Sequence, residues 1–155
     1  MRRLLAKQPS PPRIILCTDD WPRQKIEWLH RRGNCFISLC HAEGWGIGAF
    51  EAAGRGKPVV MTGFGGQLDF LPEELAYLVK YTLAEVRDAS THSLFQSKQQ
   101  WATASVRHGA ELLRHVFEHQ EDARKRAEKL RRHVHAQFGE VPVIKKLRDI
   151  LEQRP

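Results

Sequence analysis

Short apolar runs alternate with longer segments of helical periodicity along the first hundred residues. The runs have the length and composition of buried strands, and a cap or turn signal bounds most of them. Four segments are strand candidates: residues 14–17, 35–39, 58–62 and, more weakly, 77–80. Two helices are predicted between them, one from Pro22 to a stop at Gly33 and one from Gly46 to a left-handed closing residue at Gly56.

The last third of the chain reads as helix. Ser105 is placed to cap a helix whose apolar residues recur every three to four positions, and the same spacing continues to Phe138. Gly139 and Pro142 interrupt the pattern, and residues 143–151 form a final amphipathic segment.

Strands that alternate with helices over short connections predict βαβ units and a parallel sheet covered on both faces. We therefore expect an α/β fold with a helical C-terminus. A lead-in would span 1–12, an α/β domain 13–104, and helices of 105–155 would pack on that same domain. Four strands make a thin sheet, so either an N-terminal part of a larger fold lies elsewhere or another chain, in a homo-oligomer, supplies it.

Composition and charge narrow the class of protein to which the chain can belong. The 155 residues suit one domain, and 41% hydrophobic with 28% charged residues excludes a disordered chain. The net charge of +7 lies at the two ends, while residues 34–106 are slightly acidic. Basic residues near the C-terminus alternate with acidic ones at helical spacing, which indicates a solvated helix face and not a nucleic-acid surface.

The sequence also predicts where the chain resides. Its longest apolar run, residues 75–79, is far too short to cross a bilayer, and residues 1–6 lack the apolar core of a secretory signal. We expect a cytoplasmic protein, with peripheral attachment to the inner face of a membrane as the alternative. The three cysteines show no disulfide or zinc spacing, so buried thiols are expected.

Candidate chemistry is concentrated in residues 41–51, between a predicted strand and a predicted helix. Three glycines uncover the backbone there, at Gly44, Gly46 and Gly48. A helix that begins near Gly46 would present free N–H groups and the positive end of its dipole, which attract a phosphate or diphosphate. Glu43 and Glu51 bracket this point and suit sugar or ribose hydroxyls. The alternative is that these glycines serve helix packing alone.

A family resemblance favours the interpretation that this loop binds a phosphate-containing ligand. The E-G-W-G of residues 43–46, the E-A-A of 51–53 and the G-K-P-V-V of 56–60 closely resemble the E-x7-E segment of retaining GT-B glycosyltransferases of the group 1 type. Residues 62–70, 77–79 and 101–112 continue the likeness. It implies a Rossmann-like fold, specifically part of the C-terminal, donor-binding lobe of such an enzyme.

The resemblance also implies roles for residues. Glu43 and Glu51 would be the active-site carboxylates, the first on donor-sugar hydroxyls and the second on the ribose. The donor-binding positions would be Gly44, Trp45, Gly46, Ile47, Gly48, Gly65 and Gly66. The partners would be a nucleotide-sugar donor and a sugar, polysaccharide or lipid-linked acceptor. No metal or other cofactor would be needed, and no nucleic acid would be bound.

Several departures keep other interpretations open. The family's basic pair that clamps the diphosphate has no match, and neither does its acceptor lobe, so association with a separate N-terminal lobe is expected. The rivals are a noncatalytic or truncated binding module derived from such an enzyme, a basic domain for nucleic acid or anionic membrane, and a sugar-nucleotide epimerase. His41 is either a packed histidine or a substrate contact, and the pair His115 and His119 is expected to be solvated.

Overall fold

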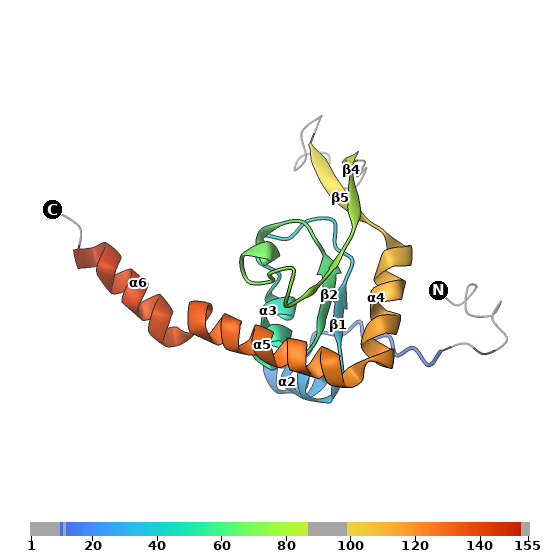
Figure 1. Ribbon diagram of the computed structural model, residues 1–155, viewed down its shortest axis with the longest axis horizontal. Helices are drawn as coiled ribbons and strands as arrows, with labels where there is room; N and C mark the ends of the chain where they lie inside the picture. The colour runs from blue at the N-terminus through green and yellow to red at the C-terminus, as the bar shows by residue number, and fades with distance from the viewer. Residues whose placement is uncertain (1–9, 11, 87–98, 153–155) are drawn as a thin grey trace.

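The computed structural model describes residues 10, 12–86 and 99–152. Its centre is a parallel sheet of three strands, β1 (Phe36–Ser38), β2 (Val59–Thr62) and β3 (Tyr77–Val79), in the order β1-β2-β3 (Figure 1). Phe36 pairs with Val59, and Val60 pairs with Tyr77. Three of the four strand predictions, and the predicted α/β class, are confirmed.

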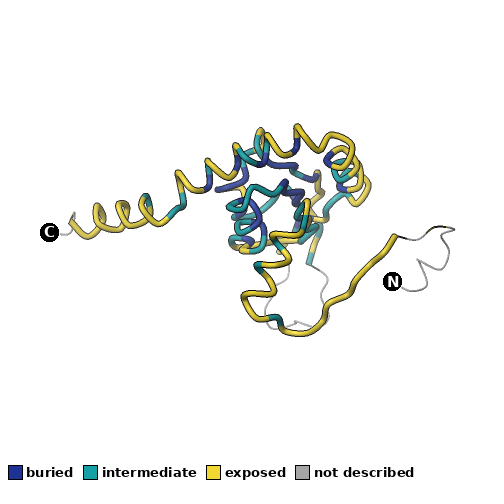
Figure 2. The backbone as a smooth tube through the Cα atoms, turned by 90° about the horizontal axis from the view of Figure 1, so that it is seen from below, coloured by how far each residue is buried: buried dark blue, intermediate teal, exposed yellow. Residues whose placement is uncertain are grey.

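Helices cover both faces of this sheet. On one face, Val59 and Met61 of β2 join a core cluster with α3 (Ile47–Gly54) and α5 (Gln120–Phe138). On the other face, Val60 packs with residues of β3 and with Val116 of α4 (Val106–Glu118). Figure 2 shows the buried backbone gathered in this one layered region. All four residues of β2 are buried, as a central parallel strand requires.

The predicted helices form between the expected signals. α2 (Arg23–Arg32) starts after Pro22 and ends at Gly33, and Gly56 adopts a φ of 69° just beyond α3. The Ser105 hydroxyl caps α4 by accepting a hydrogen bond from the His108 backbone N–H at 3.2 Å. The periodicity from residue 105 to 138 is split in two, because the chain turns at His119 between α4 and α5.

The strand predicted at residues 14–17 is wrong. These residues have no regular secondary structure, and Ile14, Ile15 and Leu16 are 47%, 71% and 71% exposed. An apolar run becomes a buried strand only where another strand offers its backbone, and in the described chain β1 pairs only with β2. Cys17 lies in the same segment and is exposed, so the prediction of buried thiols is wrong for this residue.

A β-hairpin was not predicted. β3 leads directly into β4 (Tyr81–Glu85), which pairs antiparallel with β5 (Gln100–Ala104). The hairpin rises beyond the carboxyl end of the parallel strands (Figure 1). Its strands mix exposed, half-buried and buried residues without a clear alternation, so the sequence pattern gives little indication of them.

The final helix, α6 (Glu140–Glu152), has no buried residue and extends away from the body of the domain. Among the residues that the structure describes, no helix is both long and apolar enough to cross a membrane. α4 and α5, by contrast, pack on the sheet. Residues 1–9 of the predicted lead-in lie outside the described part of the chain.

Candidate functional site

Three segments meet at the carboxyl edge of the parallel sheet, where ligands bind in folds of this class. They are the loop 39–46 after β1, the loop 63–66 after β2, and the hairpin that follows β3. The first of these loops contains Glu43 and leads into α3. The predicted ligand-binding loop therefore lies at the expected edge of the sheet.

The start of α3 has no side-chain cap, and its N-cap residue is itself buried. Its N-cap is Gly46, with φ 78° and ψ 60°, and no side chain caps the helix. The first N–H groups of an α-helix have no partner within it, so at α3 they are left for solvent or a ligand. Ile47, the first helical residue, is exposed. Gly48 lies against β1, since a Cβ there would be 3.1 Å from the Phe36 ring. Packing explains Gly48 without a ligand.

Backbone atoms of the loop after β1 occupy the space where side chains of Gly65 and Gly66 would lie. The Gly66 N–H donates a hydrogen bond to the Glu43 carbonyl at 3.1 Å. A Cβ on Gly66 would lie 1.8 Å from the Gly44 carbonyl oxygen, and one on Gly65 would lie 2.9 Å from the Glu43 carbonyl oxygen. These glycines let the two loops touch backbone to backbone. They thereby fix the position of Glu43 and Gly44, whose own exposed surfaces remain uncovered.

A buried amide lies beneath this junction. Gln67, in the short helix η1 (Gly66–Asp69), is fully buried, and its Nε2 donates to the carbonyls of Thr62 and Phe64. Its Oε1 has no hydrogen-bond partner in the described chain, and neither has the buried Thr62 hydroxyl. Buried polar atoms are rarely left without a partner, so these two can accept from a bound water or ligand. The sequence pattern did not single out Gln67.

Trp45 is partly buried and packs against the core. Its ring centroid lies 5.6 Å from Phe50, 5.1 Å from Phe70 and 5.3 Å from Phe138. The aromatic cluster joins the loop to α3, η1 and the end of α5. The indole anchors the loop, so the backbone of Trp45 is what remains for a ligand.

The two carboxylates have different surroundings. Glu43 is exposed. The Glu51 Oε2 lies 3.3 Å from Nε2 of His30 and 3.7 Å from Nη1 of Arg55. The His30 side chain is only 11% exposed, and burial, with the nearby charge of Arg55, lowers its pKa. Glu51 is therefore held between α2 and the end of α3. No sequence motif pointed to His30.

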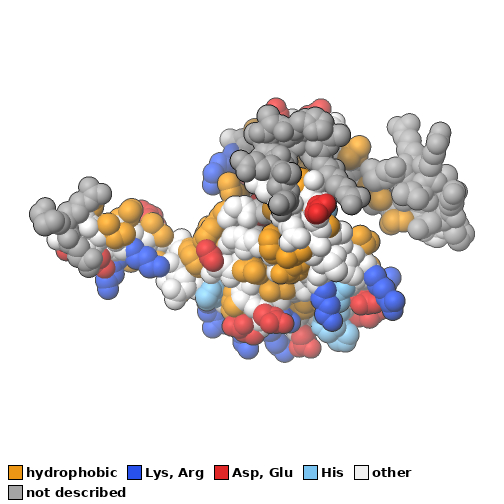
Figure 3. Space-filling view, turned by 90° about the horizontal axis from the view of Figure 1, so that it is seen from above, with side chains coloured by type: hydrophobic (Ala, Val, Ile, Leu, Met, Phe, Trp, Pro, Cys, Tyr) orange, Lys and Arg blue, Asp and Glu red, His pale blue; other side chains and the backbone are white. Residues whose placement is uncertain are grey.

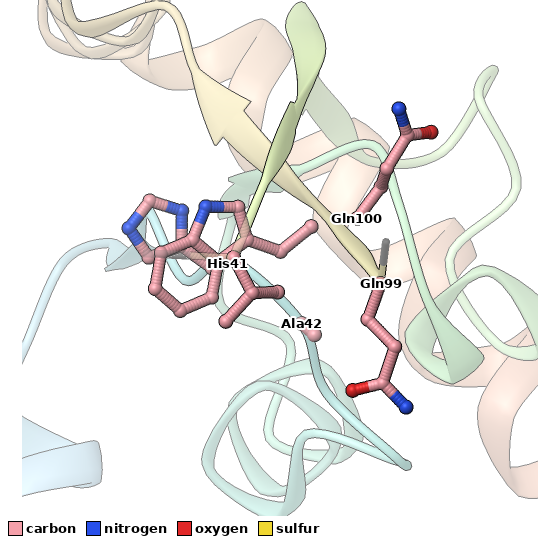
Figure 4. A pocket seen from close by; sticks show the side chains of 6 residues that line it. His41, Ala42, Gln99 and Gln100 are labelled. Carbon is pink, nitrogen blue, oxygen red and sulfur yellow. The ribbon is translucent and has the colours of Figure 1, made fainter. Parts of the chain in front are cut away.

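His41 connects the loop to the hairpin. Its Nδ1 lies 2.7 Å from the Ala102 carbonyl oxygen, and its backbone carbonyl accepts from the Ala102 N–H at 3.0 Å. Its ring stacks on Trp101 at 4.3 Å between centroids. A cavity of about 540 Å³ lies here, lined by His41, Ala42, Val86, Gln99, Gln100 and Trp101 (Figure 4).

In the part of the chain that the structure describes, no three His, Cys, Asp or Glu side chains are grouped so that they could hold a metal ion. The rings of His115 and His119 stack on each other at 4.4 Å at the end of α4, and both residues are exposed. The edge instead combines open amides, carboxylates and buried acceptors. That set can bind an anion and neighbouring hydroxyl groups.

Comparison with known proteins places the chain in a family. A family model described as a family 4 glycosyltransferase in conflict systems matches residues 18–147, which is most of the chain and includes the whole edge described above. A comparison with curated proteins gives no match. The extent of the family match shows that this chain belongs to the family 4 glycosyltransferases of conflict systems.

Proposed function

We propose that this domain binds the nucleotide-sugar donor of a glycosyltransferase at the start of α3, as the C-terminal lobe of a GT-B enzyme would. The diphosphate would lie against the free N–H groups after Gly46, with Glu43 near the donor sugar. The Glu51 carboxylate would accept hydrogen bonds from the ribose hydroxyls. Transfer would go to a sugar, polysaccharide or lipid-linked acceptor, held in part by another lobe or chain.

The observation that carries this proposal is the uncapped start of α3 at the carboxyl edge of the sheet. The helix dipole favours negative charge at that point, and the left-handed N-cap Gly46 has no side chain that could cap the helix. The buried side chain of Gln67 begins beside this turn, since a Cβ on Gly46 would be 3.6 Å from the Gln67 Cβ, and its unpartnered Oε1 lies at Gly65, 2.7 Å from where a Cβ would be.

A charge placed at this point tests the proposal. Ile47→Asp adds an anion at the first helical position, which stabilises an isolated helix end but repels a diphosphate. We expect UDP, GDP or ADP to raise the Tm of the original chain. In Ile47→Asp the Kd should rise about tenfold or more, with the Tm of the free protein unchanged or higher.

Ile47→Asn is the matched control, because it has a similar shape to Asp without the charge. It should bind the nucleotide within about threefold of the original chain. Equal nucleotide affinity in all three proteins, or no nucleotide binding by the original chain, would reject the site at α3.

A second candidate is a binding module without transferase activity. It is favoured by the contacts of Glu51, whose carboxylate already faces His30 and Arg55. In that case the nucleotide would bind while Glu51→Gln changed its affinity little. Measuring donor hydrolysis and sugar transfer, with and without an added acceptor lobe, separates the two candidates. Turnover that depends on Glu43 and Glu51 supports the enzyme.

A further inference from the structure

We propose that the cavity between residues 41–42 and β5 is a binding site for an uncharged sugar ring, with His41 as its hydrogen-bond acceptor. The site deepens the proposed function and rests on it for the sugar's part in the reaction. The cavity lies on the loop that contains Glu43, on the side of that loop that is hydrogen-bonded to the hairpin.

The hairpin and the loop form this cavity together. Two hydrogen-bond contacts join His41 to Ala102, one through the ring and one through the backbone. Val86 donates its N–H to the Gln99 carbonyl at 3.0 Å, which closes the far end of the described hairpin. In Figure 4, Gln99 and Gln100 point in opposite directions, with Gln99 on the side of Ala42. The cavity therefore has a polar side chain from each of its two walls.

The contact to Ala102 fixes the chemistry of the imidazole. A carbonyl oxygen only accepts hydrogen bonds, so the proton of the neutral ring must be on Nδ1. Nε2 then carries a lone pair and accepts. Stacking on Trp101, with only 10° between the ring planes, holds the imidazole in this orientation. The result is an acceptor with a fixed orientation on a residue that lines the cavity.

The lining indicates an uncharged polyhydroxyl ligand. None of the six described lining residues is Lys, Arg, Asp or Glu, so these six residues offer no countercharge to a phosphate or an ammonium group. The same lining contains apolar groups of Ala42, Val86 and Trp101 together with two amides and the imidazole. A pyranose ring has the matching surface, with apolar C–H faces and a rim of hydroxyls that donate and accept.

The sugar could belong to the acceptor or to the donor, and the experiment has an arm for each. Calorimetric titrations of the full chain would use methyl glycosides of glucose, galactose, mannose and N-acetylglucosamine, then nucleoside diphosphates, then the corresponding nucleotide sugars. For an acceptor sugar we expect a glycoside to bind alone. For a donor sugar we expect the nucleotide sugar to bind more tightly than its diphosphate.

Two substitutions at His41 separate packing from binding. His41→Asn keeps a donor near the position of Nδ1 and loses Nε2, so sugar-dependent affinity should fall about five- to tenfold. His41→Gln places its amide near the position of Nε2 and should recover much of that loss. His115→Gln, on the exposed surface of α4, is the control and should bind like the original chain. If His41→Asn lowers the Tm, His41→Phe, which keeps a ring against Trp101, replaces it and should show the same loss.

The outcomes distinguish the two proposals. Loss of sugar-dependent affinity in His41→Asn with unchanged binding of the diphosphate supports the sugar site. The absence of sugar-dependent binding in every arm, or equal binding in the His41 variants, overturns it. Sugar binding without any nucleotide binding would reject the site at α3 and leave the sugar site standing.

Discussion

The glycines of α3 and of the loop after β2 have different surroundings. Gly48 faces the Phe36 ring, Gly66 faces the Gly44 carbonyl, and Gly54 has no atom within 4 Å of an added Cβ. At Gly48 and Gly66 a side chain would meet a neighbouring group, so lack of space explains the glycine. At Gly54 there is room for a side chain, so space does not explain the glycine.

Alanine at Gly66 and at Gly54 should have opposite effects. In Gly66→Ala the Cβ would overlap the Gly44 carbonyl, which must move, so we expect a loss of about 1–3 kcal/mol in the free energy of unfolding. In Gly54→Ala the helix gains up to about 0.5–1 kcal/mol, because alanine loses less conformational freedom than glycine. Urea denaturation measures both. A neutral Gly66→Ala would contradict the contact between the two loops.

Cys35 should be far less reactive than an ordinary thiol. Burial raises its pKa to about 11, which lowers its thiolate fraction about a hundredfold at neutral pH. In a Cys17→Ser/Cys40→Ser variant, iodoacetamide at pH 7.5 should react at least about a hundredfold faster in denaturant than in the folded state. Similar rates in both states would mean that β1 opens readily.

At the scale of elements, α2 is joined to α3 by polar contacts more than by buried area. α2 has no buried residue, but His30 lies against Glu51 and Arg55, and the Lys57 Nζ donates to the Arg31 carbonyl. Burial dominates the balance at His30 and keeps its pKa below 6.5 in the folded chain. Protonation of His30 therefore favours the unfolded state.

Because of His30, the folded chain should lose stability as the pH falls. The unfolded chain binds more protons at His30 than the folded chain does, so its contribution to stability is present above pH 6.5 and is lost as the pH falls below that value. We expect His30→Gln to flatten the decline of Tm between about pH 7.5 and 5 relative to the original chain. His115→Gln is the control. A steeper decline in His30→Gln would mean that the Glu51 charge, not burial, dominates at this residue.

At the scale of the molecule, α6 stands apart from the core. Figure 3 shows it projecting to the left, with hydrophobic side chains along part of its surface and Lys and Arg side chains along another. Its exposed apolar residues are Val141, Val143, Ile144, Leu147, Ile150 and Leu151. None of them contributes to the core clusters of the described chain.

Removal of α6 should therefore leave the fold intact. A chain that ends at residue 141 keeps Leu130, Val134 and Phe138 in the core, so we expect its Tm to stay within about 3 °C of the original. A chain that ends at residue 129 loses these three side chains and should unfold at much lower temperature. Calorimetry of both tests the assignment, and a large drop in the longer chain would contradict it.

The sequence by itself determined the elements whose signals are local. Apolar periodicity and backbone preferences depend on near neighbours in the sequence. They predict the three parallel strands, the helices between and after them, the Ser105 cap and the left-handed Gly56. The segment that resembles glycosyltransferases was likewise visible in the sequence, and the family match includes it.

Only the tertiary structure decided what fills the space around those elements. Residues 14–17 are as apolar as β1, yet they are exposed because, among the residues that the structure describes, no strand pairs with them. Trp45 enters an aromatic cluster, Glu51 meets His30, and Gly66 meets Gly44 through contacts between residues more than 20 apart in sequence or on different elements. Such contacts depend on how the layers pack, and a pattern of near neighbours carries no information about that.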